Sequence, residues 1–195
     1  MKISEAIILA GGKGSRLHHL TKNTPKPMLL VAGRPFLEIL LNYLIQQNIN
    51  KVILSVGHFH EKIVNYFGTK YKSICIEYCI EDRPLGTGGA ILHSIEKANN
   101  NDVFVINGDT LFNISLKSLS YLHFNSRSKL TIALKKKSKT ERFGKITLGD
   151  ANLIDQVSEK KNKGSGLING GVYLINKALF DSKDFGEAFS FEIEI

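Results

Sequence analysis

A glycine-rich segment near the start of the chain has the residue types that bind a polyanion. The sequence GGKGSR occupies positions 11–16, directly after a short apolar run, and PKPM occupies positions 25–28. Glycines let backbone N–H groups approach a ligand closely, and successive N–H groups in such a loop form a concavity that binds anions. Arg16 and Lys26 place two positive charges beside this loop. The segment therefore suits the phosphates of a nucleoside triphosphate.

Two well-known phosphate-binding patterns do not fit this segment. The P-loop pattern G-x-x-x-x-G-K-[ST] is absent, and the dinucleotide pattern G-x-G-x-x-G fails because Leu17 stands where its third glycine should be. A glycine-rich turn that only connects a strand to the next element is the alternative interpretation. The glycines alone do not decide between these two interpretations.

A carboxylate at the end of a later apolar run is a candidate metal ligand. Asp109 closes the sequence INGD, which overlaps the end of the run DVFVI at positions 102–106. An aspartate at the carboxyl end of a strand, beside a phosphate-binding loop, suits a Mg²⁺ ion that bridges to phosphates. A turn without a metal is the alternative. We favour the metal because Asp109 is expected at the same sheet edge as the glycine-rich loop.

The segment EDRPLGTGGA at positions 81–90 is a candidate nucleobase site. The Glu81 carboxylate can accept two parallel hydrogen bonds, and guanine offers such a pair from its N1–H and its exocyclic amine. Gly86 allows close backbone contact with a ligand. We expect Thr87 to cap the helix that follows. A loop carboxylate exposed to solvent is the alternative for Glu81.

Two later segments have groups that suit a sugar phosphate. Glu159 and Lys160 follow an expected strand. The carboxylate can accept hydrogen bonds from sugar hydroxyls, and the lysine can neutralise a phosphate. Asn169 and Gly171, in the sequence NGGVY at positions 169–173, add an amide and a flexible backbone to the same pocket. Ordinary loop structure is the alternative for both segments.

The elements before these residues predict a layered α/β fold. Strand-like and helix-like segments alternate through the first half, which implies parallel strands covered by helices. The expected strands lie at 6–10, 51–56, 73–80 and 102–106, and the expected helices at 35–48, 61–67 and 87–98. Ligands bind at the carboxyl ends of the strands in such sheets. The glycine-rich loop and the loops at Glu81 and Asp109 are therefore expected at one edge.

The second half of the chain predicts a different kind of sheet. Strands are expected at 129–136, 143–148, 152–157 and 171–175, after a helical piece at 119–124. This succession indicates mixed or antiparallel sheet that extends the first half and shapes a pocket. We therefore predict a Rossmann-like three-layer α/β sandwich, with a mostly parallel central sheet and additional mixed or antiparallel strands. A single domain is expected over residues 1–195.

Composition indicates an ordinary globular protein that handles anions. The chain has 195 residues, of which 43% are hydrophobic and 23% charged, and its formal net charge is +8. Its basic runs lack the aromatic interleaving or module signature of a nucleic-acid binder. No apolar run would span a bilayer, and no signal pattern is visible. We expect a cytoplasmic protein without nucleic-acid or membrane partners, and we expect its two cysteines to be reduced.

Taken in order, these motifs resemble a known enzyme family. GGKGSRL, PKPM, EDRPLGTGGA, NGD, SEK and NGGVY follow the pattern of the sugar-1-phosphate nucleotidylyltransferases, from about position 6 to position 173. Within that family the chain is most similar to D-glycero-D-manno-heptose 1-phosphate guanylyltransferases, and next to mannose-1-phosphate guanylyltransferases. The resemblance implies a nucleotide-diphospho-sugar transferase-like fold. It also implies transfer of GMP from GTP to a sugar 1-phosphate, with release of pyrophosphate, for synthesis of lipopolysaccharide or capsule.

The resemblance also implies a role for each residue in the matching motifs. A sugar-phosphate oxygen attacks the α-phosphorus of the nucleotide in line, and Mg²⁺ is the cofactor, held by Asp109. The catalytic residues are Arg16, Lys26 and Asp109. The nucleotide-binding residues are Gly11, Gly12, Gly14, Ser15, Glu81, Gly86 and Thr87. The residues that bind the sugar phosphate are Glu159, Lys160, Asn169 and Gly171.

The sequence departs from the family pattern at two places. Lys161 stands where the family often has proline, and the sequence stops at Ile195, before a D-x-G-[TI]-P-E-D-Y segment whose first aspartate is a second Mg²⁺ ligand. The second departure favours the alternative of a nucleotide or sugar-phosphate binding protein without turnover. A dinucleotide-dependent oxidoreductase is a third hypothesis, against which the broken glycine pattern argues. The base, the sugar and a homo-oligomeric state are left open.

Overall fold

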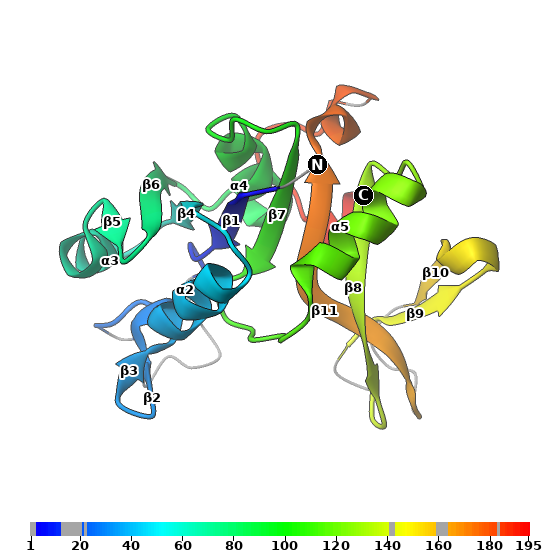
Figure 1. The fold of residues 1–195 in the computed structure, drawn as a ribbon, viewed down its shortest axis with the longest axis horizontal. Helices are drawn as coiled ribbons and strands as arrows, with labels where there is room; N and C mark the ends of the chain where they lie inside the picture. Colours follow the sequence, from blue (N-terminus) through cyan, green and yellow to red (C-terminus); the bar gives the residue numbers. More distant parts are fainter. Residues whose placement is uncertain (1–2, 13–20, 22, 141–142, 159–163, 183) are drawn as a thin grey trace.

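A mixed sheet forms the centre of the computed structural model, which describes residues 3–12, 21, 23–140, 143–158, 164–182 and 184–195. Within these residues, nine strands join in the order β10-β9-β11-β7-β1-β4-β6-β5, with β8 paired to β11 (Figure 1). The strands are β1 (Glu5–Leu9), β4 (Lys51–Val56), β5 (Lys70–Tyr71), β6 (Ile74–Ile80), β7 (Asp102–Asn107), β8 (Leu130–Lys137), β9 (Lys145–Leu148), β10 (Ile154–Ser158) and β11 (Gly166–Asn176). A separate hairpin joins β2 (Leu30–Val31) to β3 (Arg34–Pro35).

Helices cover both faces of the sheet. They are α2 (Phe36–Gln46), α3 (His60–Phe67), α4 (Gly86–Ile95), α5 (Leu116–Asn125) and α6 (Phe191–Glu194), with 3-10 turns η2 (Lys26–Met28), η3 (Asp150–Asn152) and η4 (Lys177–Ser182). Apolar residues of α2, α3 and α5 pack on one face, and those of α4 and α6 on the other. The predicted three-layer arrangement is therefore confirmed.

The parallel core of the sheet consists of strands that are apolar on both faces. β1 lies between β4 and β7 and runs parallel to both. Ala6 and Ile8 face the α2 layer, while Ile7 faces the α4 layer, and all three are fully buried. Strands buried on both faces read as continuous apolar runs, which is why the sequence located them well. β6 pairs parallel to β4 and completes this core.

Antiparallel strands extend the sheet on the other side of β7. The long strand β11 pairs antiparallel with β7, β8 and β9, and β9 pairs antiparallel with β10. The prediction of added mixed or antiparallel strands is therefore confirmed. The expected strand at 171–175 is only the second half of β11, because a bulge that contains Gly171 interrupts the alternation. Sequence reasoning also missed β5, a two-residue strand that follows α3.

The four predicted helices all differ from their predicted bounds: α2, expected at 35–48, spans Phe36–Gln46, and α3, expected at 61–67, begins one residue earlier at His60. The helical piece expected at 119–124 begins at Leu116, because the Ser115 hydroxyl oxygen accepts a hydrogen bond from the Ser118 amide at 3.2 Å and caps the helix. The helix expected at 87–98 begins at Gly86 and ends at Ile95. None of the described helices is long and apolar enough to cross a membrane.

Candidate functional site

The loops that follow the parallel strands meet at one edge of the sheet. The Ala10 amide donates to the Ser55 carbonyl at 2.7 Å, which joins the end of β1 to the end of β4. The Glu81 amide donates to the Val56 carbonyl at 2.8 Å, and the Gly108 amide to the Leu9 carbonyl at 2.9 Å. The prediction that the three candidate loops lie together is confirmed.

Lys26 and Asp109 form the charged centre of this edge. The Lys26 ammonium lies 2.5 Å from Asp109 Oδ2. Lys26 belongs to the turn η2, where Pro25 and Pro27 fix the backbone and Pro27 is buried. Asp109 follows β7, next to Gly108, and both line a small cleft together with Gly12. Residues expected to handle phosphates therefore come together in the fold.

The ionisation of Asp109 depends on opposing effects. Burial raises the pKa of this carboxyl, but the hydrogen bond and the charge of Lys26, with a further bond from the Thr110 hydroxyl, outweigh it. The net result is a pKa below the ordinary value of an aspartate. Asp109 is thus held as a carboxylate beside a cation, and its side chain keeps 43% exposure for a ligand.

The donor set around Asp109 suits an ion that takes most of its ligands from a substrate. Within the described residues, no group of three or more His, Cys, Asp or Glu side chains gathers that would hold a metal ion by itself. Mg²⁺ is commonly bound by one or two carboxylates, with phosphate oxygens and waters completing its octahedron. One exposed carboxylate at a phosphate-binding edge fits that pattern.

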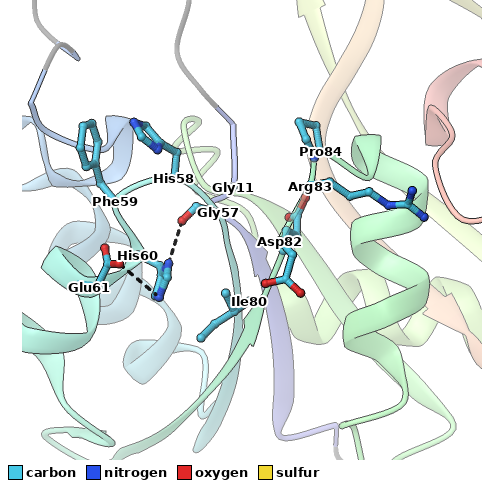
Figure 2. Close-up of a pocket in the computed structure, with 11 residues that line it drawn as sticks. Gly11, Gly57, His58, Phe59, His60, Glu61, Ile80, Asp82, Arg83 and Pro84 are labelled. Atoms are coloured by element: carbon cyan, nitrogen blue, oxygen red, sulfur yellow. Dashed lines mark hydrogen bonds and ion pairs between the residues drawn. The ribbon is translucent and has the colours of Figure 1, made fainter.

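A cavity opens beside Gly11, where the glycine-rich segment begins. It has a volume of about 580 Å³, and Gly11 and Gly57 are among the residues that line it. Figure 2 shows His58 and Phe59 on one side and Asp82, Arg83 and Pro84 on the other. His60 Nδ1 lies 3.2 Å from the Gly57 carbonyl oxygen, and this contact stabilises the turn that carries His58 and Phe59. The cavity has the size and mixed lining of a small-ligand site.

Glu81 lies inside this edge rather than extending into solvent. Its Oε1 accepts a hydrogen bond from the buried Ser55 hydroxyl at 2.8 Å, and its Oε2 accepts one from the Leu85 amide at 3.3 Å. The carboxylate rests against the backbone of Gly11, where a Cβ would overlap it. Sequence reasoning placed Glu81 at the site but missed Ser55, since a serine within an apolar strand gives no signal of its own.

Thr87 does not cap a helix, so that expectation was wrong. It lies in the first turn of α4, whose N-cap is Leu85, and its hydroxyl is directed to the end of the chain. Thr87 Oγ1 donates to Glu192 Oε2 at 2.7 Å and accepts from the Phe191 amide at 2.9 Å. Gly86 has φ +70° and would overlap the Phe189 carbonyl if it carried a Cβ. Both residues therefore contact the segment before and within α6.

Asn169 and Gly171 lie together in the bulge of β11. Gly171 has φ +73°, and its amide donates to Asn169 Oδ1 at 2.8 Å. Asn169 Nδ2 donates in turn to the Tyr173 hydroxyl at 2.8 Å. A Cβ at Gly171 would lie 2.9 Å from the Asn107 amide nitrogen, so only glycine fits there. Tyr173 and Asn107 were not predicted as site residues, although both belong to the quoted motifs.

Five of the predicted site residues lie outside the described residues: Gly14, Ser15, Arg16, Glu159 and Lys160. Their roles stay predictions. Gly12 is described, and among the described residues no atom lies within 4 Å of the position that its Cβ would take.

Comparison with known proteins finds relatives over nearly the whole chain. The sequence profile of the family described as "Nucleotidyl transferase" matches residues 5–189. The D-glycero-alpha-D-manno-heptose 1-phosphate guanylyltransferases of Aneurinibacillus thermoaerophilus and Campylobacter jejuni are 45% and 43% identical over 188 residues, which cover 96% of this chain and 81% and 83% of those relatives. The crystal structure of HddC from Yersinia pseudotuberculosis complexed with GMP-PN matches with a TM-score of 0.85 and 31% identity, over 99% of this chain and 85% of that one.

Proposed function

We propose that this chain, which belongs to the nucleotidyl transferase family, transfers GMP from GTP to D-glycero-α-D-manno-heptose 1-phosphate and releases pyrophosphate. The observation that carries the proposal is the position of the Lys26–Asp109 pair, at the same sheet edge as the cavity above Gly11. The two heptose 1-phosphate guanylyltransferases named above support the choice of substrates.

The proposed reaction is a single displacement at phosphorus. A phosphate oxygen of the sugar 1-phosphate attacks the α-phosphorus of GTP, a new P–O bond forms, and the bond to the β-phosphate oxygen breaks. Pyrophosphate leaves with the electron pair, and the nucleotide-sugar retains the GMP unit. No covalent bond to the protein forms, so catalysis consists of positioning and of neutralising charge.

The substrates would lie along the sheet edge in a definite order. The base would occupy the cavity over Gly11, near Glu81, and the triphosphate would extend to Lys26. Lys26 would neutralise negative charge as it shifts to the leaving pyrophosphate. Asp109 would hold Mg²⁺, which when bound supplies further positive charge to the phosphates. Asn169 and Gly171 would line the side that receives the sugar.

The remaining assignments follow the family pattern. Gly12, Gly14 and Ser15 would complete the nucleotide loop, and Arg16 would stabilise the leaving pyrophosphate. Glu159 and Lys160 would bind the sugar and its phosphate. We include in the proposal a single nucleotidyltransferase domain over residues 1–195, a cytoplasmic location, and a role in making a precursor of lipopolysaccharide or capsule.

Pyrophosphate release with Mg²⁺, measured for four nucleoside triphosphates against several sugar 1-phosphates, tests the proposal. Release with GTP and the manno-configured heptose phosphate, above all other pairs, is the expected result. Release with GTP and mannose 1-phosphate would keep the reaction and change the sugar. Binding of GTP without release from any pair would contradict the proposed turnover and favour a binding protein instead.

A further inference from the structure

The segment around Phe189, just before α6, is hydrogen-bonded to the start of α4. The Phe189 amide donates to the Leu85 carbonyl at 3.0 Å, and the Gly88 amide donates to the Phe189 carbonyl at 3.0 Å. A Cβ at Gly88 would overlap the Phe189 ring, which is itself buried. The glycines of the sequence GTGG therefore make room for this segment, and the contact holds α6 in place beside β11.

Glu192 of α6 links two parts of the candidate site that are far apart in sequence. Its Oε2 accepts hydrogen bonds from the Thr87 hydroxyl at 2.7 Å and from the Ser190 hydroxyl at 3.2 Å. Its Oε1 accepts a bond from the Tyr173 hydroxyl at 3.5 Å. Both oxygens of one carboxylate are thus used, one toward α4 and one toward β11.

The hydrogen bonds from Gly171 through Asn169 and Tyr173 to Glu192 all run in one direction. Asn169 Oδ1 accepts from the Gly171 amide, so the Asn169 amide nitrogen must point to Tyr173 and donate to its oxygen. Because that oxygen already accepts a bond, the phenol proton goes to Glu192, an acceptor without protons of its own. Burial raises the pKa of Tyr173 and the charge of Glu192 raises it further, so the phenol keeps its proton.

The surroundings of Tyr173 give its hydroxyl few alternatives. The side chain is 1% exposed, and its ring packs edge-on against Phe191, with centroids 5.4 Å apart. Asn107 Oδ1 is buried and, within the described part of the chain, accepts no hydrogen bond. Without the carboxylate, the phenol proton would turn toward another acceptor, and the Asn169 amide would lose its fixed partner.

We propose that Glu192 is a positioning residue for the sugar-phosphate side of the site: by accepting the Tyr173 proton it keeps the phenol oxygen as an acceptor for the Asn169 amide, and so holds that amide in place. This inference rests on the proposed function, because Asn169 is the residue assigned to the sugar. A hydrogen bond of this kind contributes roughly a three- to tenfold change in affinity. The larger effect is expected on the second substrate, because neither Glu192 nor its partner Thr87 is among the described residues that line the cavity at Gly11.

Steady-state kinetics of Glu192→Ala and Glu192→Gln test this role, with Glu194→Ala, an exposed residue of the same helix, as the matched control. We expect Glu192→Ala to raise the KM for the sugar 1-phosphate about three- to tenfold and to leave the KM for GTP within about twofold. Glu192→Gln should cause a smaller rise, because one amide oxygen remains as an acceptor. The control should match the wild type.

A double-mutant cycle with Tyr173→Phe separates positioning from simple loss of stability. In the Tyr173→Phe background, Glu192→Ala should raise the sugar-phosphate KM by less than about twofold more, since the connection is already cut. Equal changes in both KM values, fully multiplicative effects of the two substitutions, or no change would each overturn the inference. If Glu192→Ala does not fold, Glu192→Gln and Tyr173→Phe give the same comparison.

The failure of this inference and the failure of the proposed function give different results. If the wild type shows no turnover, the proposed function is wrong, and so is this inference. If the wild type is active and the variants have unchanged KM values, only this inference is wrong.

Discussion

The ammonium of Lys26 and the carboxylate of Asp109 lie 2.5 Å apart, although 83 positions separate them in the sequence. A turn fixed by two prolines supplies one partner, and the end of β7 supplies the other. Each charge balances the other in this pair. A phosphate that enters between the two side chains would attract Lys26, and a cation bound to that phosphate would attract Asp109. Substrate binding is therefore expected to separate the two side chains.

Lys26→Met should lower kcat by about a hundredfold or more, because removing one positioned group that stabilises developing charge typically costs that much. The substitution keeps an unbranched side chain that is shorter by one atom, and it removes the terminal ammonium with its charge and hydrogen bonds. Pyrophosphate release at saturating substrates is the measurement. Lys136→Met, on the exposed side of β8, is the matched control and should retain full activity. A Lys26→Met variant as active as this control would remove Lys26 from the mechanism.

Asp109→Asn should raise the Mg²⁺ concentration needed for half-maximal turnover by at least about tenfold, since a neutral amide is a weaker ligand for this ion. Turnover should vanish in EDTA and return with added Mg²⁺ in the wild type, but return only at high Mg²⁺ in the variant. A titration of pyrophosphate release against Mg²⁺ measures both. Identical curves for the two proteins would show that Asp109 does not hold the metal.

The Lys26–Asp109 pair should make a small, pH-dependent contribution to stability. The pKa of Asp109 is lower in the folded protein than its ordinary value, so the unfolded chain binds a proton at this carboxyl more readily. The contribution is therefore fully present above the unfolded pKa of about 4 and is lost as the pH falls through the folded pKa. Partial exposure of both side chains keeps it small.

Urea unfolding of the wild type and of Asp109→Asn between about pH 3 and pH 7 measures this contribution. The difference between the two midpoints should be largest at neutral pH and shrink toward the acid end. A difference that grows as the pH falls would contradict a lowered pKa of Asp109 in the folded protein. Asp150→Asn, at an exposed turn, serves as the control carboxylate.

His123→Ala should destabilise the fold by about 2–4 kcal/mol, because it opens a cavity and leaves buried polar groups unpaired. His123 is 1% exposed, its Nδ1 lies 2.8 Å from the Thr131 hydroxyl, and its Nε2 lies 3.1 Å from Asp102 Oδ1. These contacts join α5 to β8 and β7. Chemical denaturation measures the free energy of unfolding, and His93→Ala on the exposed side of α4 should change it by less than about 0.5 kcal/mol. A loss no larger than that of the control would show that this network is not stabilising.

The sequence predicted the parallel core well because its signals are local. Continuous apolar runs such as those of β1 and β7 are typical of strands buried on both faces, and the order of elements determines which loops share an edge. It also predicted that Lys26, Asp109 and Glu81 would lie at one edge of the sheet, where the structure has them.

What the sequence could not predict depends on contacts between distant segments. Thr87 reads as a helix cap, yet its hydroxyl bonds Glu192, more than a hundred positions away. Ser55 reads as part of an apolar strand, yet its hydroxyl holds Glu81. The first half of β11 was not predicted, because the bulge at Gly171, which has a positive φ, interrupts the alternation of apolar and polar residues along the strand. Each of these is decided by packing, which no local pattern records.

Gly11→Ala and Gly12→Ala form a matched pair that tests how the base is held. A Cβ at Gly11 would overlap the Glu81 carboxylate, which Ser55 and the Leu85 amide keep in place, whereas a Cβ at Gly12 has no atom of the described residues within 4 Å. Gly11→Ala should therefore displace Glu81, weaken GTP binding by about tenfold or more, and lower the melting temperature by several degrees, because an overpacked contact costs about 1–3 kcal/mol.

Calorimetric binding of GTP and of ATP, together with thermal unfolding, measures these effects. Gly12→Ala should keep the melting temperature of the wild type. Both substitutions stiffen the backbone, so a loss of melting temperature in Gly11→Ala alone comes from the overlap with Glu81. If Glu81 recognises guanine, its displacement should also reduce the preference for GTP over ATP, and Glu81→Gln should do the same without the thermal penalty. A Gly11→Ala variant that binds GTP weakly but keeps the full preference would assign base selection to another residue of the cavity and leave Glu81 with a purely structural role.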